Sequence, residues 1–222
     1  MPATMTKKAF RALAGLAVPA RRIRTLEKLT EHLLWRMPPQ EVERHLEFAA
    51  TLPDGCLAGA RLFPDREAML HVLPKGGVAG EIGTWKGEFS ALIAEICVPE
   101  IFHLFDIDFG PLKEPPGKVV KHLGDSSVSL ARTPNASFDW LYIDGDHSYD
   151  GVAKDLSAAG RAIKPGGYLM CNDYTNWCSP SVSPYGVARA VNDFVIANDY
   201  SVEGLALHPA GLYDILIRKP NH

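Results

Sequence analysis

Two groups of polar side chains in the second half of the chain have the types and spacing of a catalytic site. Asp144 and His147 lie in the run IDGDHSY, and Asn172 and Asp173 directly follow the apolar run YLMC. If both apolar runs are neighbouring strands, three oxygen donors converge, and such donors select Mg²⁺ or Mn²⁺ over Zn²⁺. His147 suits a general base, because its unperturbed pKa is about 6.5. A metal ligand and a surface histidine are the alternatives for His147.

A glycine-containing run, EIGTWKG, suits the methionine end of a cationic cofactor. It holds Glu81, Gly83 and Gly87 between an apolar run and a helical pattern. A glycine turn at this place lets a ligand approach the backbone closely. Trp85 stands where the dinucleotide fingerprint has its middle glycine, and the carboxylate of Glu81 would repel a pyrophosphate. The same carboxylate suits the amino and sulfonium groups of S-adenosylmethionine.

Acids after the next two apolar runs fit the rest of such a cofactor. Asp106 lies 23 residues beyond Gly83, close to the spacing of about 20 that brings an acid to a ribose. Asp108 is the alternative for this role. Asp125 and Ser126 stand where an adenine amino group can be met, or Asp125 caps a helix.

These residues need a scaffold that gathers strand ends, and the chain from residue 76 onward has the pattern of one. Short apolar runs alternate with helical segments, which predicts a doubly wound α/β sheet, mostly parallel, with ligands at the carboxyl ends of its strands. The expected strands are 78–82, 101–107, 118–123, 138–143, 168–171, 200–205 and 212–217, and the expected helices are 88–96, 149–163 and 186–197.

The first third of the chain shows none of these motifs. Residues 24–72 have a helical pattern, interrupted at Pro38-Pro39 and at Pro53-Asp54-Gly55. We expect residues 1–75 to form an N-terminal helical cap on a domain of residues 76–222. The basic first 26 residues are either a targeting segment or a peripheral N-terminus.

Composition excludes several classes of protein. The chain has 222 residues, of which 46% are hydrophobic, and a formal net charge of −3. This composition argues against disorder and against nucleic acid as a partner. No apolar run approaches the roughly 18 residues of a membrane span. Four scattered cysteines predict reduced thiols and a cytoplasmic location. The sequence leaves open whether the protein forms a homo-oligomer.

Four runs together, EIGTWKG, YIDGDHSYDGV, KPGG and NDY, resemble the class I S-adenosylmethionine-dependent methyltransferases. The nearest branch is that of small-molecule O-methyltransferase-like proteins, which includes macrocin-type and cephalosporin-hydroxylase-like proteins. The resemblance covers residues 76–218 and implies a Rossmann-like sheet of seven strands with an antiparallel last strand. It implies cofactor contacts from Glu81, Gly83, Gly87, Asp106, Asp125, Ser126 and Asp144, and Mg²⁺ or Mn²⁺ ligands from Asp144, Asn172 and Asp173.

The expected function is methyl transfer from S-adenosylmethionine to a hydroxyl of a small molecule, with metal assistance. His147 and Asp144 are the expected catalytic residues. One alternative is a cofactor-binding protein of the same fold that transfers no methyl group. A nicotinamide-dependent oxidoreductase is another, and Trp85 and Glu81 argue against it.

Overall fold

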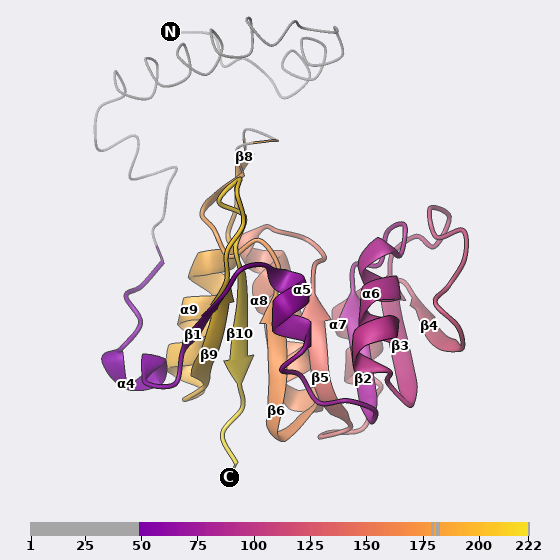
Figure 1. Ribbon diagram of the computed structural model, residues 1–222, viewed down its shortest axis with the longest axis horizontal. Helices are drawn as coiled ribbons and strands as arrows, with labels where there is room; N and C mark the ends of the chain where they lie inside the picture. The colour runs from indigo at the N-terminus through magenta and orange to yellow at the C-terminus, as the bar shows by residue number, and fades with distance from the viewer. Residues whose placement is uncertain (1–48, 179, 181–182, 222) are drawn as a thin grey trace, which may run out of the picture. The chain divides into compact units, whose positions relative to one another are not determined.

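The computed structural model describes residues 49–178, 180 and 183–221. The expected helices over residues 24–48 and the basic N-terminus lie outside this part. The described chain is built on a sheet in the order β1-β9-β10-β6-β5-β2-β3-β4 (Figure 1). Its strands are β1 (Arg61–Phe63), β2 (Val78–Ile82), β3 (Ile101–Asp106), β4 (Val119–Leu123), β5 (Phe138–Ile143), β6 (Ile163–Cys171), β9 (Ser201–Ala206) and β10 (Asp214–Arg218).

The expected mostly parallel sheet is confirmed, but it has eight strands rather than seven. Strands β2 to β6 pair in parallel, and β10 runs antiparallel to both β6 and β9. The eighth strand is β1, which pairs in parallel with β9 at the edge of the sheet. Its three residues are too short for alternation to reveal a strand, and only Phe63 among them is buried.

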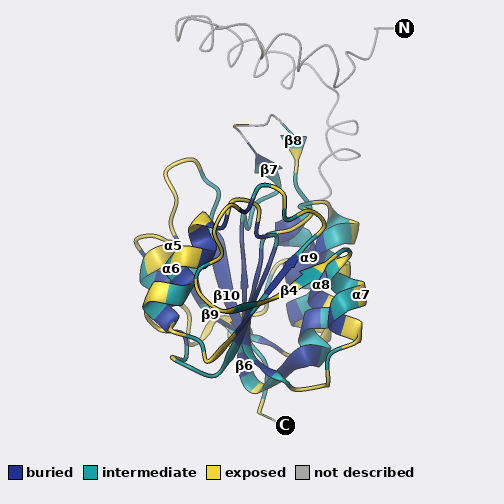
Figure 2. Cartoon of the chain, turned by 90° about the vertical axis from the view of Figure 1, so that its right-hand side faces the viewer, coloured by how far each residue is buried: buried dark blue, intermediate teal, exposed yellow. Residues whose placement is uncertain are grey.

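Helices cover both faces of the sheet (Figure 2). One face carries α5 (Arg66–Leu70) and α6 (Glu88–Cys97); the other carries α7 (Ser126–Ala131), α8 (Tyr149–Ala162) and α9 (Val187–Ala197). A further short helix, α4 (Asp54–Leu57), begins where the sequence predicted a helix to end. The strands β7 (Trp177–Cys178) and β8 (Ser183–Pro184) form a separate small hairpin.

Two apolar layers hold the helices to the sheet. Leu156 and Val191 pack in the layer beneath α8 and α9, whereas Leu70 and Ile93 pack in the layer beneath α5 and α6. All four side chains are fully buried. The segment around Leu70 therefore belongs to the core, although its sequence pattern predicted part of a cap. Among the described helices, none has the length and apolarity to cross a bilayer.

Candidate functional site

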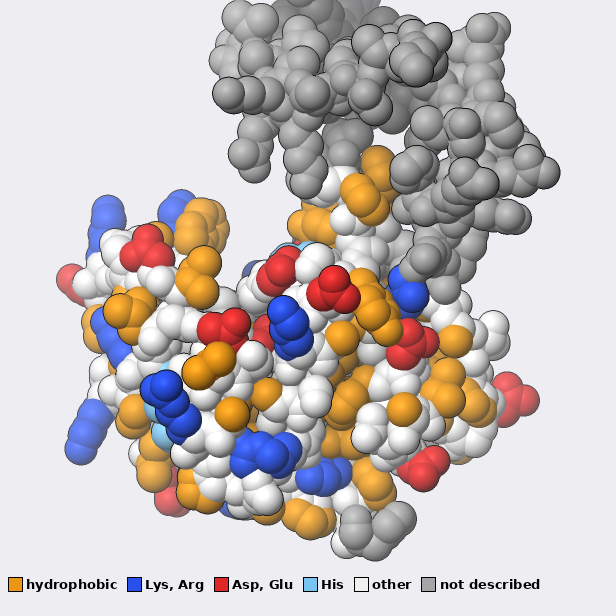
Figure 3. All heavy atoms as spheres, turned by 180° about the vertical axis from the view of Figure 1, so that it is seen from behind, with side chains coloured by type: hydrophobic (Ala, Val, Ile, Leu, Met, Phe, Trp, Pro, Cys, Tyr) orange, Lys and Arg blue, Asp and Glu red, His pale blue; other side chains and the backbone are white. Residues whose placement is uncertain are grey.

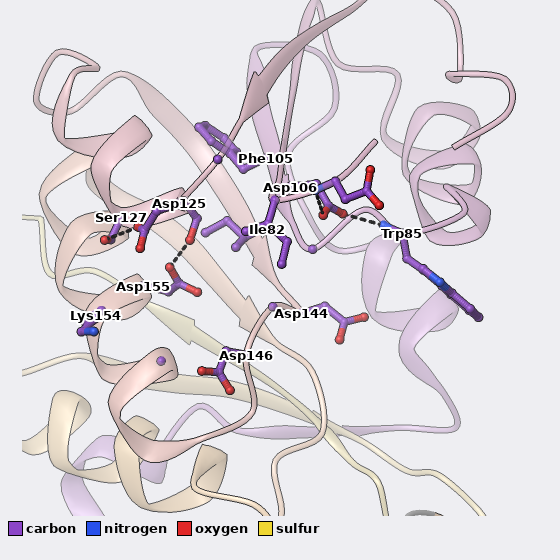
Figure 4. A pocket seen from close by; sticks show the side chains of 17 residues that line it. Ile82, Trp85, Phe105, Asp106, Asp125, Ser127, Asp144, Asp146, Lys154 and Asp155 are labelled. Carbon is purple, nitrogen blue, oxygen red and sulfur yellow. Dashed lines mark hydrogen bonds between the residues drawn. The ribbon is translucent and has the colours of Figure 1, made fainter. Parts of the chain in front are cut away.

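A cavity of about 740 Å³ lies at the carboxyl ends of β2, β3 and β5 (Figure 4). This is the edge of the sheet at which the sequence predicted ligands to bind. Of the expected cofactor residues, Gly83, Asp106, Asp125, Ser126 and Asp144 line it. The other lining residues are Ile82, Trp85, Phe105, Ile107, Asp108, Gly124, Ser127, Gly145, Asp146, Gly151, Lys154 and Asp155.

The turn after β2 requires glycine at two positions. Gly83 has a φ of +85°, and a Cβ atom there would lie 2.0 Å from the backbone oxygen of Asp144. Gly87 has a φ of +79°, and a Cβ atom there would lie 2.4 Å from Cδ1 of Leu112. Gly87 is the N-cap of α6 and does not line the cavity. Gly83 thus lets the turn pack closely against the end of β5, and Gly87 lets it pack against Leu112 in the loop after β3.

Asp106 ties this turn to the end of β3. Its Oδ2 atom accepts hydrogen bonds from the backbone N–H groups of Thr84 and Trp85, both at 2.8 Å. Its Oδ1 atom accepts one from the backbone N–H of Asp108 at 3.0 Å. Asp106 thus shapes the cavity wall as well as lining it. Ile107, 80% exposed, adds an apolar surface beside it that the sequence analysis did not identify.

Glu81 lies away from the cavity, contrary to the contact that the resemblance implies. The side chain is 1% exposed and accepts a hydrogen bond from the hydroxyl of Ser90 on α6. Alternation along β2 turns it toward the α5–α6 face, whereas Ile82 turns toward the other. Burial raises the pKa of Glu81 to about 8, although the Ser90 hydrogen bond opposes the shift. At neutral pH this carboxyl group holds its proton and supplies little charge.

Asp125 is both a helix cap and part of the cavity wall. Its side chain accepts a hydrogen bond from the backbone N–H of Val128 at 3.1 Å, at the start of α7. The neighbouring Ser126 hydroxyl donates to Asp155 of α8. Asp155 is 5% exposed, and burial raises its pKa to about 6. No sequence motif marked Asp155, because helix α8 delivers it to the cavity from a distant position in the chain.

Acidic residues dominate the electrostatics of the cavity. Figure 3 looks onto the α7–α9 face and shows several acidic side chains, in red, close together around a hollow. Lys154 is the single basic residue that lines the cavity among the described residues. Such surroundings favour a cationic ligand over a pyrophosphate. The acidic lining residues are Asp106, Asp108, Asp125, Asp144, Asp146 and Asp155.

Beside the cavity, His147 brings together the residues of the expected metal site. Its Nε2 atom lies 3.4 Å from Oδ1 of Asp144 and 3.7 Å from Oδ2 of Asp173. Oδ1 of Asn172 lies 3.3 Å from the same atom. The ring of Tyr185 stacks on the imidazole at 4.6 Å between centroids, with 11° between the planes. The three oxygen-bearing side chains therefore lie around one point, the Nε2 atom of His147.

The charges of this cluster act on one another. Burial lowers the pKa of His147, but Asp144 and Asp173 raise it by more, so the net shift is upward. Burial raises the pKa of Asp173, and the repulsion of Asp144 adds to this, while His147 opposes it. Asp173 also has a φ of +51°, an uncommon backbone conformation for a residue with a Cβ atom.

The donor set of Asp144, Asn172 and Asp173 fits a hard cation. Among the described residues, no group of three or more His, Cys, Asp or Glu side chains has the arrangement of a metal site. A cation bound between Asp144 and Asp173 would need the amide oxygen of Asn172 as its third ligand. The point of convergence coincides with Nε2 of His147, so the imidazole would have to turn aside for a cation to take that position.

Three aromatic residues that follow β6, namely Tyr174, Trp177 and Tyr185, differ in their contacts. Tyr185 contacts His147 directly. Tyr174 instead donates its hydroxyl hydrogen to Oδ1 of Asn192 at 2.6 Å and packs against the core beneath α9. Trp177 lies in the β7–β8 hairpin. Of these three aromatic residues, Tyr185 is the one with a described contact to His147.

Comparison with known proteins gives a match to the segment that holds most of these residues. Residues 81–174 match a family described as a methyltransferase domain. The uncharacterized protein R132 of Acanthamoeba polyphaga mimivirus is 32% identical over 96 residues, 42% of each chain. The match therefore spans less than half of that relative.

Two solved structures share the fold at low identity. The 1,6-didemethyltoxoflavin-N1-methyltransferase of Burkholderia thailandensis, with bound S-adenosylhomocysteine, is 17% identical with a TM-score of 0.51, covering 69% of this chain and 76% of that one. MycE methyltransferase of the mycinamycin pathway, in complex with Mg and S-adenosylhomocysteine, is 16% identical with a TM-score of 0.50, covering 67% and 46%. The chain thus has the α/β fold of class I methyltransferases, and its residues 81–174 match a methyltransferase domain.

Proposed function

We propose that this protein transfers the methyl group of S-adenosylmethionine to a hydroxyl oxygen of a small molecule. One observation carries the proposal. Asp144 lines the cavity, and its Oδ1 atom lies 3.4 Å from Nε2 of His147. A cofactor-sized cavity and a candidate general base therefore share a residue, which is the juxtaposition that methyl transfer to oxygen requires.

Two further features support this cofactor. The acidic lining suits a sulfonium and an ammonium group, and the turn at Gly83 leaves backbone room for a ligand. The family match covers the cavity residues between Glu81 and Asp155. The neighbours of the same fold bind S-adenosylhomocysteine, the product of such a reaction.

His147 would remove the proton of the acceptor hydroxyl. Oxygen atoms of Asp144, Asn172 and Asp173 surround Nε2, so the neutral ring carries its proton there and Nδ1 is the basic nitrogen. Nδ1 takes the hydroxyl proton as the oxygen attacks the methyl carbon. The new C–O bond forms while the C–S bond breaks, and its electron pair goes to sulfur, giving S-adenosylhomocysteine. Stacking on Tyr185 holds the imidazole plane during this step.

In an alternative arrangement, with the imidazole of His147 turned aside, Asp144, Asn172 and Asp173 would hold the Mg²⁺ or Mn²⁺ ion of the proposal. A divalent cation there would lower the pKa of a bound substrate hydroxyl. Two carboxylates and one amide leave coordination positions for substrate and water. The neighbour MycE in complex with Mg and S-adenosylhomocysteine supports this part of the proposal.

Titration calorimetry with S-adenosylhomocysteine, and separately with NAD, tests the cofactor. We expect binding of the former alone, and NAD binding without S-adenosylhomocysteine binding would overturn the proposal. A screen of catechols, sugars and polyketides with methyl-labelled cofactor then tests transfer. Cofactor binding without transfer to any of them would favour the alternative, a binding protein of the same fold.

A further inference from the structure

A buried acid behind the proposed site has no role in the function described above. Asp214, the first residue of β10, is 3% exposed. Its Oδ1 atom accepts a hydrogen bond from Nδ2 of Asn172 at 3.3 Å, and its Oδ2 atom accepts one from the hydroxyl of Tyr142 at 3.2 Å. Asp214 does not line the cavity and lies outside the segment of the family match.

The acid is held in place by a chain of contacts that reaches the surface on the α5–α6 face. The Tyr142 hydroxyl, fully buried, accepts a hydrogen bond from an N–H of Arg66 at 3.1 Å. The guanidinium group of Arg66 lies over the ring of Phe89, 4.5 Å from its centroid. Burial raises the pKa of Asp214 to about 7, and the positive charge of Arg66 opposes that rise.

The ionised form of Asp214 favours one orientation of the Asn172 amide. A carboxylate offers acceptors and no donor, so above the pKa of Asp214 the Nδ2 group of Asn172 faces it, as the hydrogen bond to Oδ1 shows. Its Oδ1 atom then faces Nε2 of His147, at 3.3 Å. A flipped amide would set two oxygens against each other at Asp214 and leave a buried N–H group without its acceptor, which is costly.

We propose that Asp214 is a positioning residue that locks the Asn172 amide with its oxygen facing His147 and the proposed cation position. This inference rests on the proposed function, in which that oxygen holds the His147 tautomer or a metal ion. It also makes Arg66 and β10 parts of the site, although neither touches the cavity. Replacing a merely structural acid would lower the stability of the fold but would leave the orientation of the Asn172 amide unchanged.

Exchanging the acid and the amide gives a test that a structural role would not pass. In Asp214→Asn, the amide oxygen at position 214 can keep the hydrogen bond from Tyr142, which turns the new N–H group toward Asn172 and removes the lock on the original orientation of the Asn172 amide. In the double variant Asn172→Asp with Asp214→Asn, the amide introduced at 214 donates to the carboxylate introduced at 172. That pair is locked again, with an oxygen facing His147.

The first readout is the side-chain amide signal of Asn172 in ¹H–¹⁵N spectra, assigned by its loss in Asn172→Asp. We expect one slowly exchanging set in the wild type, and a second set or at least tenfold faster solvent exchange in Asp214→Asn. The control is Asp139→Asn, which changes a carboxylate bonded to Val78 and Lys164 at the other end of β5. It should leave the Asn172 signals unchanged.

The second readout is Mn²⁺ affinity by calorimetry, which should fall about tenfold in Asp214→Asn and return to within about threefold in the double variant. Unchanged amide signals and unchanged Mn²⁺ affinity in Asp214→Asn would overturn the inference while leaving the proposed function intact. A wild type that binds neither Mn²⁺ nor S-adenosylhomocysteine would contradict the proposed function. The amide spectra, which need no ligand, would still decide the role of Asp214.

Discussion

The carboxylate of Asp106 holds the backbone N–H of Trp85 at 2.8 Å, and Trp85 has a φ of +46° at that point. A tryptophan in a left-handed conformation costs free energy, because its Cβ atom crowds the backbone. The hydrogen bond compensates for part of that cost and keeps the turn open beside the cavity. In Figure 4 the indole points away from the cavity, so the strain places backbone, rather than the ring, at the cavity wall.

Replacing Asp106 by alanine is expected to weaken S-adenosylhomocysteine binding by about 1.5–3 kcal/mol, or roughly 10- to 150-fold. The variant loses the acceptors for the turn as well as the predicted ribose contact. Calorimetry measures the loss, and Asp108→Ala is the matched control on the same loop. A loss in the Asp108 variant alone would move the ribose contact two residues along the chain.

Gly83→Ala is expected to destabilise the fold more than glycine-to-alanine changes at other positive φ angles. Its Cβ atom would lie 2.0 Å from the backbone oxygen of Asp144, which cannot move without shifting the end of β5. Gly117 has a φ of +76°, and a Cβ atom there would have open space within 4 Å. Gly117→Ala therefore carries only the conformational cost of about 1–2 kcal/mol. Urea unfolding compares the two, and equal losses would contradict the close approach.

Asp173→Ala is expected to abolish methyl transfer while S-adenosylhomocysteine affinity stays within about twofold. Asp173 contacts His147 at 3.7 Å and does not line the cavity. Removing it takes away a proposed metal ligand and one support of the His147 tautomer, which affects the chemical step rather than cofactor binding. Single-turnover transfer and calorimetry separate the two effects. Retained transfer would show that Asp144 and Asn172 suffice.

Leu70→Ala is expected to lower the free energy of unfolding by about 2–5 kcal/mol. Leu70 is fully buried in the layer beneath α5 and α6, although its sequence pattern predicted part of a cap. The control is Leu62→Ala on β1, where the side chain is 72% exposed and the loss should be within about 0.5 kcal/mol. Similar small losses in both variants would show that this segment is dispensable to the core.

Stability is expected to fall between about pH 6.5 and pH 4 because of a histidine pair on β3 and β4. Nδ1 of His103 lies 2.8 Å from Nε2 of His122, and burial, with a smaller effect of His122, lowers the pKa of His103 to about 4. The unfolded chain therefore takes up a proton first as the pH falls. The neutral histidine pair therefore contributes its full stability above about pH 6.5, where the unfolded chain also leaves His103 unprotonated.

The pH effect is measured by urea unfolding at about pH 7 and about pH 5, with His103→Phe as control. Buried acids such as Glu81, with a pKa raised to about 8, change stability in the opposite direction. The difference between the wild type and His103→Phe isolates the histidine. A pH dependence that the variant leaves unchanged would assign the loss to other groups.

Periodicity and turn residues predicted most of the sheet. The strands 78–82 and 138–143 have the bounds that the sequence predicted, because apolar runs end sharply at glycine and aspartate. The helix α7 was predicted only as an alternative, through Asp125 as its cap, since its sequence SSVSLA has little amphipathic pattern. The strand β1 was not predicted, because three residues gain their structure from the neighbouring β9 rather than from their own pattern.

The sequence predicted the site residues that directly follow apolar strands. It did not predict residues that reach the site because of the order of strands in the sheet. Asp144, His147, Asn172 and Asp173 come together because β5 and β6 are neighbours, as the alternating pattern predicted. Asp214 meets Asn172 only because β10 lies beside β6. That pairing depends on the order of strands in the sheet, which no local pattern of residues determines.

The position of β1 has a consequence for synthesis of the chain. Residues 61–63 pair with residues 204–206, so about 140 residues must be made before this edge of the sheet can close. Until then Phe63 lacks Gly204, whose missing side chain gives its ring room. In a nascent chain, residues 61–63 therefore remain without their β-sheet partner until residues 204–206 have been made. Chaperones would find that segment accessible during this time. Strand β1, early in the chain, therefore takes its place in the sheet only after the late strand β9 has formed.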